Sequence, residues 1–396
     1  MKPLLIVILL VLLVSAEIKA ATVEYSGYVA TETSLFAQAT KFSEQSQHSV
    51  SVATQPELYQ EWDSGTSFTF VPFGRLDSAD SERSHVDIRE LNVLLLDGNW
   101  EMRLGLGKVF WGVTEFVHLV DIINQTDLVE NINAEEKLGQ PMVHFTLIKD
   151  WGVAELFVLP YFRERTFPGV NGRLRTELVV DTDRARYESS AEQHHTDLSV
   201  RYSHTYGELD LGLHYFTGTG REPTLLPLSD SGGQLVLIPF YEQINQIGTD
   251  IQLVAGEWLW KLEALYRNGQ GDGYTAVAGG FEYTFVGIVD TAMDLGVITE
   301  YVYDSRGNRA TTPFQNDVVI GLRWAVNDLN DSTLLAGWLQ DLENPAKIFQ
   351  IEASRRLSDQ WKVELELRTF QDLPKSDPIY SLSDDDHLKL ELAYYF

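Results

Sequence analysis

The chain has 396 residues and a formal net charge of −28, from 30 basic and 58 acidic side chains, and it contains no cysteine. The acidic balance argues against a nucleic-acid partner, because phosphates require a basic protein surface. The lack of cysteine excludes disulfides and a lipid anchor attached to cysteine.

The N-terminus reads MKPLLIVILLVLLVSAEIKA over residues 1–20, with Lys2 followed by an apolar run from Leu4 to Val14 and then by small residues. This layout is typical of a secretory signal peptide. The alternative, an uncleaved anchor, is disfavoured because the run is shorter than the roughly 20 apolar residues of a spanning helix. We predict cleavage between Ala16 and Ala21, preferably after Ala20, and a single domain over 21–396.

The rest of the chain repeats a pattern of about ten alternating residues followed by a turn. The clearest examples are 100–109, 197–206, 208–216, 260–268 and 361–370. Side chains in a strand alternate between two faces, so each segment has one apolar and one polar face. We count about 18 such strands, with roughly 16 to 20 allowed. A soluble sandwich would show the same alternation and is the alternative.

The connections alternate between short and long, which separates these two interpretations. The short ones are 63–65, 97–99, 149–152, 206–207, 256–257, 287–290, 327–331 and 358–360. The longer or more polar ones are 39–48, 79–84, 111–140, 164–193, 220–245, 268–273, 304–313, 341–346 and 372–385. Short periplasmic turns and long extracellular loops are typical of bacterial outer-membrane barrels. We therefore predict an all-β fold, a transmembrane antiparallel β-barrel.

Tryptophans lie beside the short turns, at Trp62, Trp100, Trp151, Trp258, Trp324 and Trp361. Clustering on one rim indicates an aromatic girdle at a membrane interface. Aromatic residues that cap the edge of a soluble sheet could produce a similar cluster.

The chain ends in HLKLELAYYF, residues 387–396, with strict alternation and a terminal phenylalanine. An ordinary edge strand would leave a long exposed edge, which closure against residues 23–36 removes. The tail resembles the C-terminal strand of outer-membrane β-barrel proteins, which the barrel assembly machinery reads. The resemblance implies that machinery as a partner and an assembly signal made of Leu390, Leu392, Tyr394 and Phe396.

The segment from Val109 to Pro141 breaks the strand pattern. Its apolar residues recur at three- and four-residue spacing, so we predict a partly helical loop over 111–140. A loop of this length is unusual without a function. It either folds into the lumen and narrows it, or forms an amphipathic lid on the rim whose acids meet water. The candidates for lining the constriction are Glu115, Asp121, Asp127 and Glu130.

The same segment resembles one in a family of uncharacterised proteobacterial porin-like outer-membrane proteins, in which a WG…D(I/V)IN…D signature follows an early strand. The matching residues are Trp111, Gly112, Asp121, Ile123, Asn124 and Asp127. The similarity extends to about Arg165. It implies a barrel fold and an outer-membrane location, and it implies no reaction.

Charged residues on the predicted inward face are mixed in sign. The lumen candidates are Arg103, Arg201, Arg267, Arg323, Arg368, Glu263, Glu300 and Glu366. Mixed charges permit a strong transverse field, and they also permit cross-strand pairs that hold the wall rigid. A further run of arginines between Arg163 and Arg186 is interleaved with acids. That run predicts either a ladder that guides anions or, more simply, a self-neutralised external loop.

No catalytic, cofactor or metal site is predicted. Ser203 and His204 are neighbours on a predicted strand, so they face opposite sides and cannot form a nucleophile–base pair. His194–His195 with Asp197 could ligate a metal, but adjacent histidines on a strand point to opposite faces. The acidic run 384–386 could bind calcium, but it lacks the spacing of a defined calcium loop, and a solvated turn is the simpler interpretation.

The sequence therefore predicts a non-enzymatic porin-like channel for passive diffusion of small solutes across the bacterial outer membrane. The alternative is a non-conducting or plugged barrel that serves gated uptake, scaffolding or adhesion. The expected partners are outer-membrane lipid, lipopolysaccharide and small solutes, and a homotrimer is left open.

Overall fold

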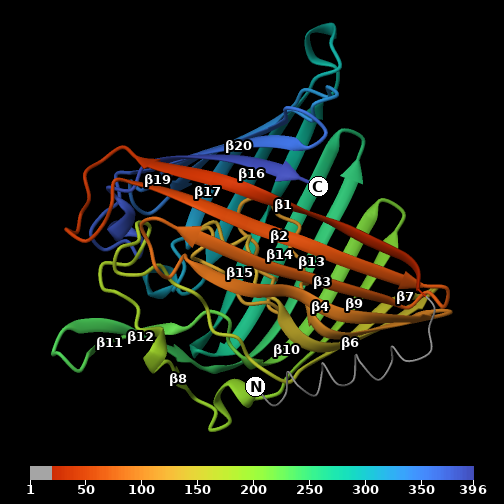
Figure 1. The fold of residues 1–396 in the computed structure, drawn as a ribbon, viewed down its shortest axis with the longest axis horizontal. Coiled ribbons are helices and arrows are strands. Elements are labelled where there is room, and N and C mark those ends of the chain that lie inside the picture. Colours follow the sequence, from red (N-terminus) through yellow and green to blue (C-terminus); the bar gives the residue numbers. More distant parts are fainter. Residues whose placement is uncertain (1–19) are drawn as a thin grey trace.

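The computed structural model describes residues 20–396, so the predicted signal peptide lies outside the described residues except for its last position. Eighteen strands form one antiparallel sheet. The sheet closes on itself because β1 (Ala20–Phe36) pairs with both β2 (His48–Trp62) and β21 (His387–Tyr395). Figure 1 shows the resulting barrel, in which the tilted strands of the near wall lie at an angle to those of the far wall. The predicted antiparallel β-barrel of about 18 strands is confirmed.

Each barrel strand pairs with the barrel strands before and after it, so the topology is up-and-down. The remaining strands are β3 (Ser67–Asp77), β4 (His85–Asp97), β5 (Trp100–Gly107), β6 (Gln140–Lys149), β7 (Gly152–Leu159), β9 (Asp197–Tyr206), β10 (Leu209–Thr219), β13 (Gln243–Ala255), β14 (Trp258–Gly269), β15 (Gly271–Phe285), β16 (Asp294–Asp304), β17 (Asn316–Ala325), β18 (Thr333–Asp341), β19 (Lys347–Arg356) and β20 (Trp361–Gln371).

One end of the barrel, called here the turn end, carries short connections, and the other, the loop end, carries long ones. Both ends of the described chain lie at the turn end, because Ala20 pairs with Trp62 and the Tyr395 amide bonds to Gln360. One predicted long connection, 268–273, is wrong. There β14 and β15 run on until only Gln270 separates them, because the glycines on either side adopt positive φ and allow a tight reversal.

A small second sheet lies among the long loops. Strand β12 (Leu235–Tyr241) pairs antiparallel with β11 (Thr224–Ser229) and parallel with β8 (Arg186–Tyr187). Figure 1 shows these strands beside the loop end of the barrel. They join the 160–196 loop to the 220–242 loop, which stiffens that rim.

The barrel wall is apolar outside and polar inside, as strand β14 shows. Trp260 and Tyr266 point outward and are 46% and 47% exposed, whereas Glu263 on the inward face is 0% exposed. A soluble sandwich would bury the apolar face and leave the charged one in water, so that alternative is excluded. The outward face requires lipid, and the chain is a transmembrane barrel.

Aromatic residues mark both ends of this outward face. Of the six tryptophans in the predicted girdle, four are exposed at the turn end, namely Trp151, Trp258, Trp324 and Trp361, while Trp62 and Trp100 are half-buried. A second, unpredicted group toward the loop end consists of Tyr215, Tyr266, Tyr301 and Tyr303. Paired aromatic girdles are expected at the two interfaces of a membrane.

The C-terminal strand has the predicted alternation. Leu390, Leu392 and Phe396 are exposed on the lipid side, and the Phe396 ring lies 5.3 Å from the Tyr25 ring across the seam. Tyr394 on the same face packs against the ring of Trp361 at 5.1 Å. Recognition of these four residues by assembly machinery stays a prediction. Among residues 20–396 no helix is long and apolar enough to span a membrane.

We expect Ile320→Arg to lower the free energy of unfolding by about 2–4 kcal/mol, because it places a charge on the lipid face in mid-strand. Ile320 is 54% exposed on the outside of β17. Denaturant titration of protein folded into lipid vesicles measures this loss. The matched control is Leu329→Arg, in the 326–332 turn, where the side chain is fully exposed and no loss is expected. Equal effects of the two variants would contradict a membrane-embedded wall.

Candidate functional site: the loop inside the barrel

The long loop 108–139 lies inside the barrel, where it bonds to inward-facing side chains of the wall. The first half of the loop is held by Glu263 of β14 and Glu300 of β16, both of which are buried. The carboxylate of Glu300 accepts hydrogen bonds from the amides of Glu115 (2.7 Å) and Phe116 (3.2 Å). The loop therefore meets the far wall of the lumen, which favours the lumen interpretation over the rim lid.

Glu263 makes the densest set of contacts with the loop. Its Oε1 accepts hydrogen bonds from the amides of Val113 (2.7 Å) and Thr114 (2.9 Å) and from the Thr114 hydroxyl (2.6 Å). Its Oε2 accepts from the amides of Leu119 (2.6 Å) and Val120 (3.1 Å). Hydrogen bonds to an ionised acceptor are shorter and stronger than neutral ones, so one wall residue fixes two turns of the loop.

The predicted helical character of 111–140 is wrong, since this segment consists of turns and bends with only isolated bridges. The physical reason is competition for amides. In a helix, each backbone amide N–H would donate to the carbonyl four residues earlier. In this loop, several of these amides donate instead to wall carboxylates. Asp121 adds to this, because its Oδ1 accepts from the amides of Trp111 (2.7 Å) and Gly112 (3.0 Å) and closes a non-helical turn.

The apolar spacing that suggested a helix arises because the loop packs on two different surfaces. Val120 and Ile123 are buried in a cluster with Phe157 of β7. Phe116 and Leu119 pack instead beside residues of the opposite wall, including Ala278 of β15. Periodicity alone cannot separate one helical face from two such contacts.

The second half of the loop is anchored on the opposite side, near the seam where the barrel closes. Asp127 pairs with Arg89 of β4 at 2.6 Å, and Glu130 pairs with Arg75 of β3 at 2.8 Å. Asn131 donates a hydrogen bond to Glu366 of β20 at 3.0 Å. Hydrogen bonds and ion pairs to opposite sides of the barrel therefore fix the loop across the lumen.

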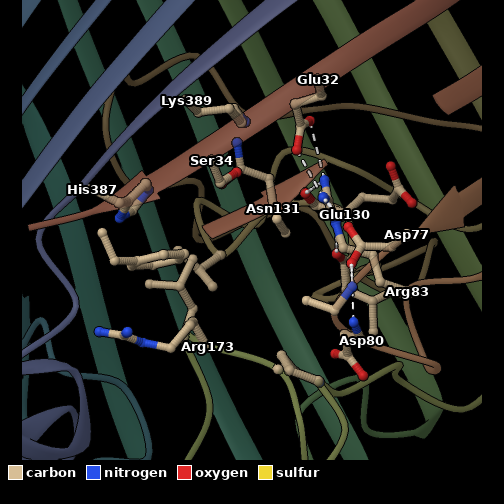
Figure 2. A pocket seen from close by; sticks show the side chains of 18 of the residues that line it. Glu32, Ser34, Asp77, Asp80, Arg83, Glu130, Asn131, Arg173, His387 and Lys389 are labelled. Atoms are coloured by element: carbon tan, nitrogen blue, oxygen red, sulfur yellow. Dashed lines mark hydrogen bonds and ion pairs between the residues drawn. The ribbon is translucent and has the colours of Figure 1, made fainter. Parts of the chain in front are cut away.

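A network of buried charges supports this second anchor. Glu32 of β1 binds Arg83 at 2.7 Å and Arg75 at 3.4 Å. Figure 2 shows Glu32, Arg83 and Glu130 grouped around a small cavity of about 80 Å³, with Lys389 and Asn131 beside them. Lys389 of β21 binds Glu366 at 2.6 Å, and Glu366 accepts the hydrogen bond from Asn131. The first and last strands are therefore both linked to the loop, and closure of the barrel is coupled to the placement of the loop. Sequence reasoning named Glu130 but missed Glu32, Arg75 and Arg83, because charged inward positions look alike along every strand and Arg83 lies in the loop between β3 and β4.

The constriction candidates do not all face open space. Glu115 lines the lumen, where it pairs with Arg323 at 2.5 Å and with Lys261 at 3.3 Å. Asp121 and Glu130 also line cavities. Asp127 does not, and its proposed lining role is wrong. It is 0% exposed because Arg89 and the hydroxyl of Thr166 enclose its carboxylate.

The lumen charge candidates lie on the inward face, and several form cross-strand pairs. Arg201 of β9 binds Asp250 of β13 through two hydrogen bonds of 2.6 and 2.8 Å. This pair crosses over Gly212 of β10, where a Cβ would collide with both side chains. The position therefore requires glycine for close approach. Arg103 of β5 lies opposite His144 of β6 in the register.

The remaining candidates also contact inward neighbours. Arg323 donates to Glu282 at 3.1 Å, and Arg267 donates to Gln246 at 2.9 Å. Arg368 lies 3.6 Å from Glu366.

The arginines between Arg163 and Arg186 differ in their partners, and only Arg184 lies near an interleaved acid, Asp181 at 3.6 Å. Arg163 pairs with Asp87 at 2.7 Å, and Arg173 pairs with Asp385 at 2.5 Å. Arg165 and Arg175 line a cavity instead. The segment is thus not a simple ladder, and its own acids neutralise it only in part.

The loop separates two cavities inside the barrel. The turn-side cavity has about 750 Å³ and reaches residues near the short turns, such as Lys362 and Tyr395. The loop-side cavity has about 430 Å³ and lies beneath the long loops. Glu115, Asn133 and Glu135 line both. These three loop residues mark the constriction.

The two cavities differ in charge. The turn-side cavity has more acidic than basic side chains, and its acids are Glu32, Glu115, Glu130, Glu135, Glu136, Glu352, Glu364, Glu366 and Glu391. Its basic side chains are Arg75, Arg89, Lys108, Arg323, Lys362 and Lys389. At the constriction Glu135 is exposed to the lumen. Enclosure by the barrel, which removes bulk water around its carboxyl, raises the pKa of Glu135 above the ordinary value.

Comparison with solved structures finds other barrels. Vibrio cholerae OmpT, an outer membrane protein in its trimer form, matches with a TM-score of 0.49 and 8% identity, over 96% of this chain and 100% of that one. An engineered variant of the Rhodopseudomonas blastica porin matches with a TM-score of 0.46 and 11% identity, over 95% and 100% of the two chains. No protein-family model matches the sequence, and no curated protein matches it.

The resemblance of the Trp111–Asp127 segment to a porin-like family therefore stays a prediction. The fold assignment rests on the strand register and on the apolar outward face. By these features the chain is a transmembrane β-barrel with a fixed loop in its lumen.

We expect Glu263→Gln to release the first half of the loop. A neutral amide accepts weaker hydrogen bonds and places an unpaired NH₂ among amide donors, and bonds to a charged group contribute about 1.5–3 kcal/mol. Hydrogen exchange of the Val113–Val120 amides should accelerate by roughly 10- to 150-fold. The matched control is Glu257→Gln in the β13–β14 turn, which should leave these amides unchanged. Unchanged exchange in Glu263→Gln would contradict the anchoring role.

Proposed function

We propose that this protein is a porin-like channel of the bacterial outer membrane that lets small solutes diffuse passively. One observation carries the proposal: the loop is anchored on opposite walls and leaves a cavity on each side, and the two cavities share Glu115, Asn133 and Glu135. A wide polar lumen narrowed by an inward loop can pass small hydrophilic molecules and retain larger ones.

The charges around the constriction support a modest preference for cations. Glu115 is neutralised by Arg323 and Lys261, so it contributes little net field. Glu135 faces the lumen at the same constriction as Glu115, and the acidic cavity lies on the turn side of it. Rings of acidic side chains favour cations in a pore.

A plugged barrel is the second candidate, and one observation favours it. The ring of Phe116 fills the space over two wall glycines, since a Cβ at either Gly321 or Gly337 would collide with it. An aromatic ring seated this closely narrows the gap between loop and wall. In that case the protein would serve gated uptake, scaffolding or adhesion.

Further parts of the proposal concern location and partners. An outward apolar face between two aromatic girdles suits a lipid bilayer, and lipopolysaccharide would surround the loop end. Assembly by dedicated machinery and a homotrimer belong to the same proposal.

A catalytic role for Ser203 and His204 is not part of the proposal. Ser203 lies opposite Gly212, while the His204 ring packs beside the exposed Tyr206.

Single-channel recording in a planar bilayer tests the proposal, using the refolded mature protein and a variant that lacks 113–138. We expect stable current steps in the intact protein and a several-fold larger conductance after deletion. Phe116→Ala keeps both sets of anchors and should raise the conductance by a smaller factor. Current only after deletion would support the plugged barrel. Silence of both, from protein shown to be folded, would contradict a channel.

We also expect the cation preference to fall in acid, beginning at a pH above the range in which an ordinary glutamate titrates. The raised pKa of Glu135 means that its charge is complete only well above that pKa and is lost as pH falls through it. Reversal potentials in a salt gradient, measured at several pH values, report this change. Glu135→Gln should reduce the high-pH part of the titration, whereas Glu257→Gln in the turn should leave it unchanged. Identical pH profiles for Glu135→Gln and the wild type would refute the assignment.

A further inference from the structure

We propose that the loop-side cavity is a binding site for an organic anion with an apolar body, such as an aryl or alkyl carboxylate. The proposal deepens the proposed function by naming a solute class for the same lumen. The binding itself does not depend on conduction. Two features of the cavity carry it: unusually apolar walls and arginines that lack close carboxylate partners.

The apolar walls come from both sides of the lumen. On one side Leu265, Tyr274 and Ala276 form a buried cluster with Leu119 of the loop. On the other, Phe370 and Leu382 belong to a second cluster. All of these residues line the loop-side cavity. A lumen that serves only ions and hydrophilic solutes is polar, so this lining indicates contact with an apolar group.

The basic side of the cavity begins with two arginines of the 160–196 loop. Within the described part of the chain, the one side-chain hydrogen bond of Arg165 is to Gln125, at 3.2 Å. Arg175 is buried and donates to the carbonyls of Thr176 (2.9 Å) and Glu177 (3.0 Å), while its Nε finds no acceptor there. Among residues 20–396, neither guanidinium group therefore forms an ion pair with a carboxylate.

Two wall arginines are similar. The carboxylate nearest to Arg267 is that of Glu222, at 3.8 Å. Arg368 lies 3.6 Å from Glu366 and 3.9 Å from Glu352, and its Nε finds no acceptor among residues 20–396.

Other arginines of the same cavity are fully paired, which sets these four apart. Arg221 binds Asp197 at 2.7 Å, and Arg306 binds Asp304 at 2.6 Å. Close ion pairs between arginine and a carboxylate therefore form in this cavity, and Arg165, Arg175, Arg267 and Arg368 do not make one.

The chemistry of the site selects one class of ligand. A guanidinium group pairs most strongly with a carboxylate, through charge-assisted hydrogen bonds. An inorganic anion would leave the apolar walls in water, and a neutral hydrocarbon would leave the arginines unpaired. Seven basic side chains line the cavity against five acidic ones, so a cation is disfavoured. The volume of about 430 Å³ lies within the range of small-molecule sites.

Isothermal titration calorimetry of the refolded protein in lipid nanodiscs tests the proposal, with 3-phenylpropionate as the probe. Two comparison probes separate the contributions: propionate lacks the apolar body, and 3-phenylpropan-1-ol lacks the charge. We expect 3-phenylpropionate to bind at least tenfold more tightly than either. Equal affinity of the three probes, or no binding of 3-phenylpropionate, would overturn the proposal.

Variants locate the site. Arg165→Gln combined with Arg368→Gln should weaken binding of 3-phenylpropionate at least tenfold, and Arg165→Lys with Arg368→Lys should restore part of it. The matched control is Arg309→Gln, on the rim, where the side chain is 76% exposed and no change is expected. Unchanged affinity in the double glutamine variant would place the binding elsewhere and overturn the proposal.

Current recordings on the same samples distinguish the two proposals. Binding without current would support this site and count against the channel. Current without binding would support the channel and overturn this site. With both in place, 3-phenylpropionate added on the loop side should reduce the current, and propionate should not.

Discussion

The contact between Glu263 and the backbone of the inner loop sets the shape of the lumen. A carboxylate with no exposure to water is costly unless its lone pairs are satisfied. Here five donors from four loop residues satisfy it. Neither partner could hold its place alone, because the loop amides would otherwise lack acceptors and the carboxylate would lack donors. The loop is therefore part of the wall rather than a flexible insertion.

The contacts of the second half of the loop determine that it crosses the lumen. Arg75 and Arg89 hold the other half of the loop near the seam, and Glu32 brings β1 into the same network. A loop fixed on two opposite sides divides the barrel instead of lying along one wall. The division produces cavities of different chemistry, acidic at the turn end and apolar with arginines at the loop end. A solute that enters from the loop side meets the arginines before it meets the acids.

The sequence predicts the barrel well and its interior less well, for a physical reason. Wall strands such as 361–370 have a period of two, and membrane burial acts on every outward position, so the pattern is repeated and readable. Glu263 was identified as an inward charge from that alternation. Its bonds to Val113 and Leu119 were not, because they join residues far apart in sequence through backbone groups that leave no signature.

The inner loop shows the same limit. Phe116 and Val120 have helical spacing, yet they contact different clusters. In the sequence Asp127 cannot be distinguished from the other acids of the loop, because its ion pair with Arg89 depends on the fold. Local pattern predicts which residues are polar or apolar, while tertiary contacts decide which of them face open space.

The most direct test of the account is liposome swelling with uncharged sugars of graded size, because it reads the width of the constriction without the influence of charge. If the loop narrows the lumen and leaves a path past Glu115 and Glu135, vesicles that contain the protein will admit small sugars and exclude larger ones at a defined cut-off. Exclusion of every sugar by protein shown to be folded would contradict an open path. Admission of all sizes alike would contradict a constriction.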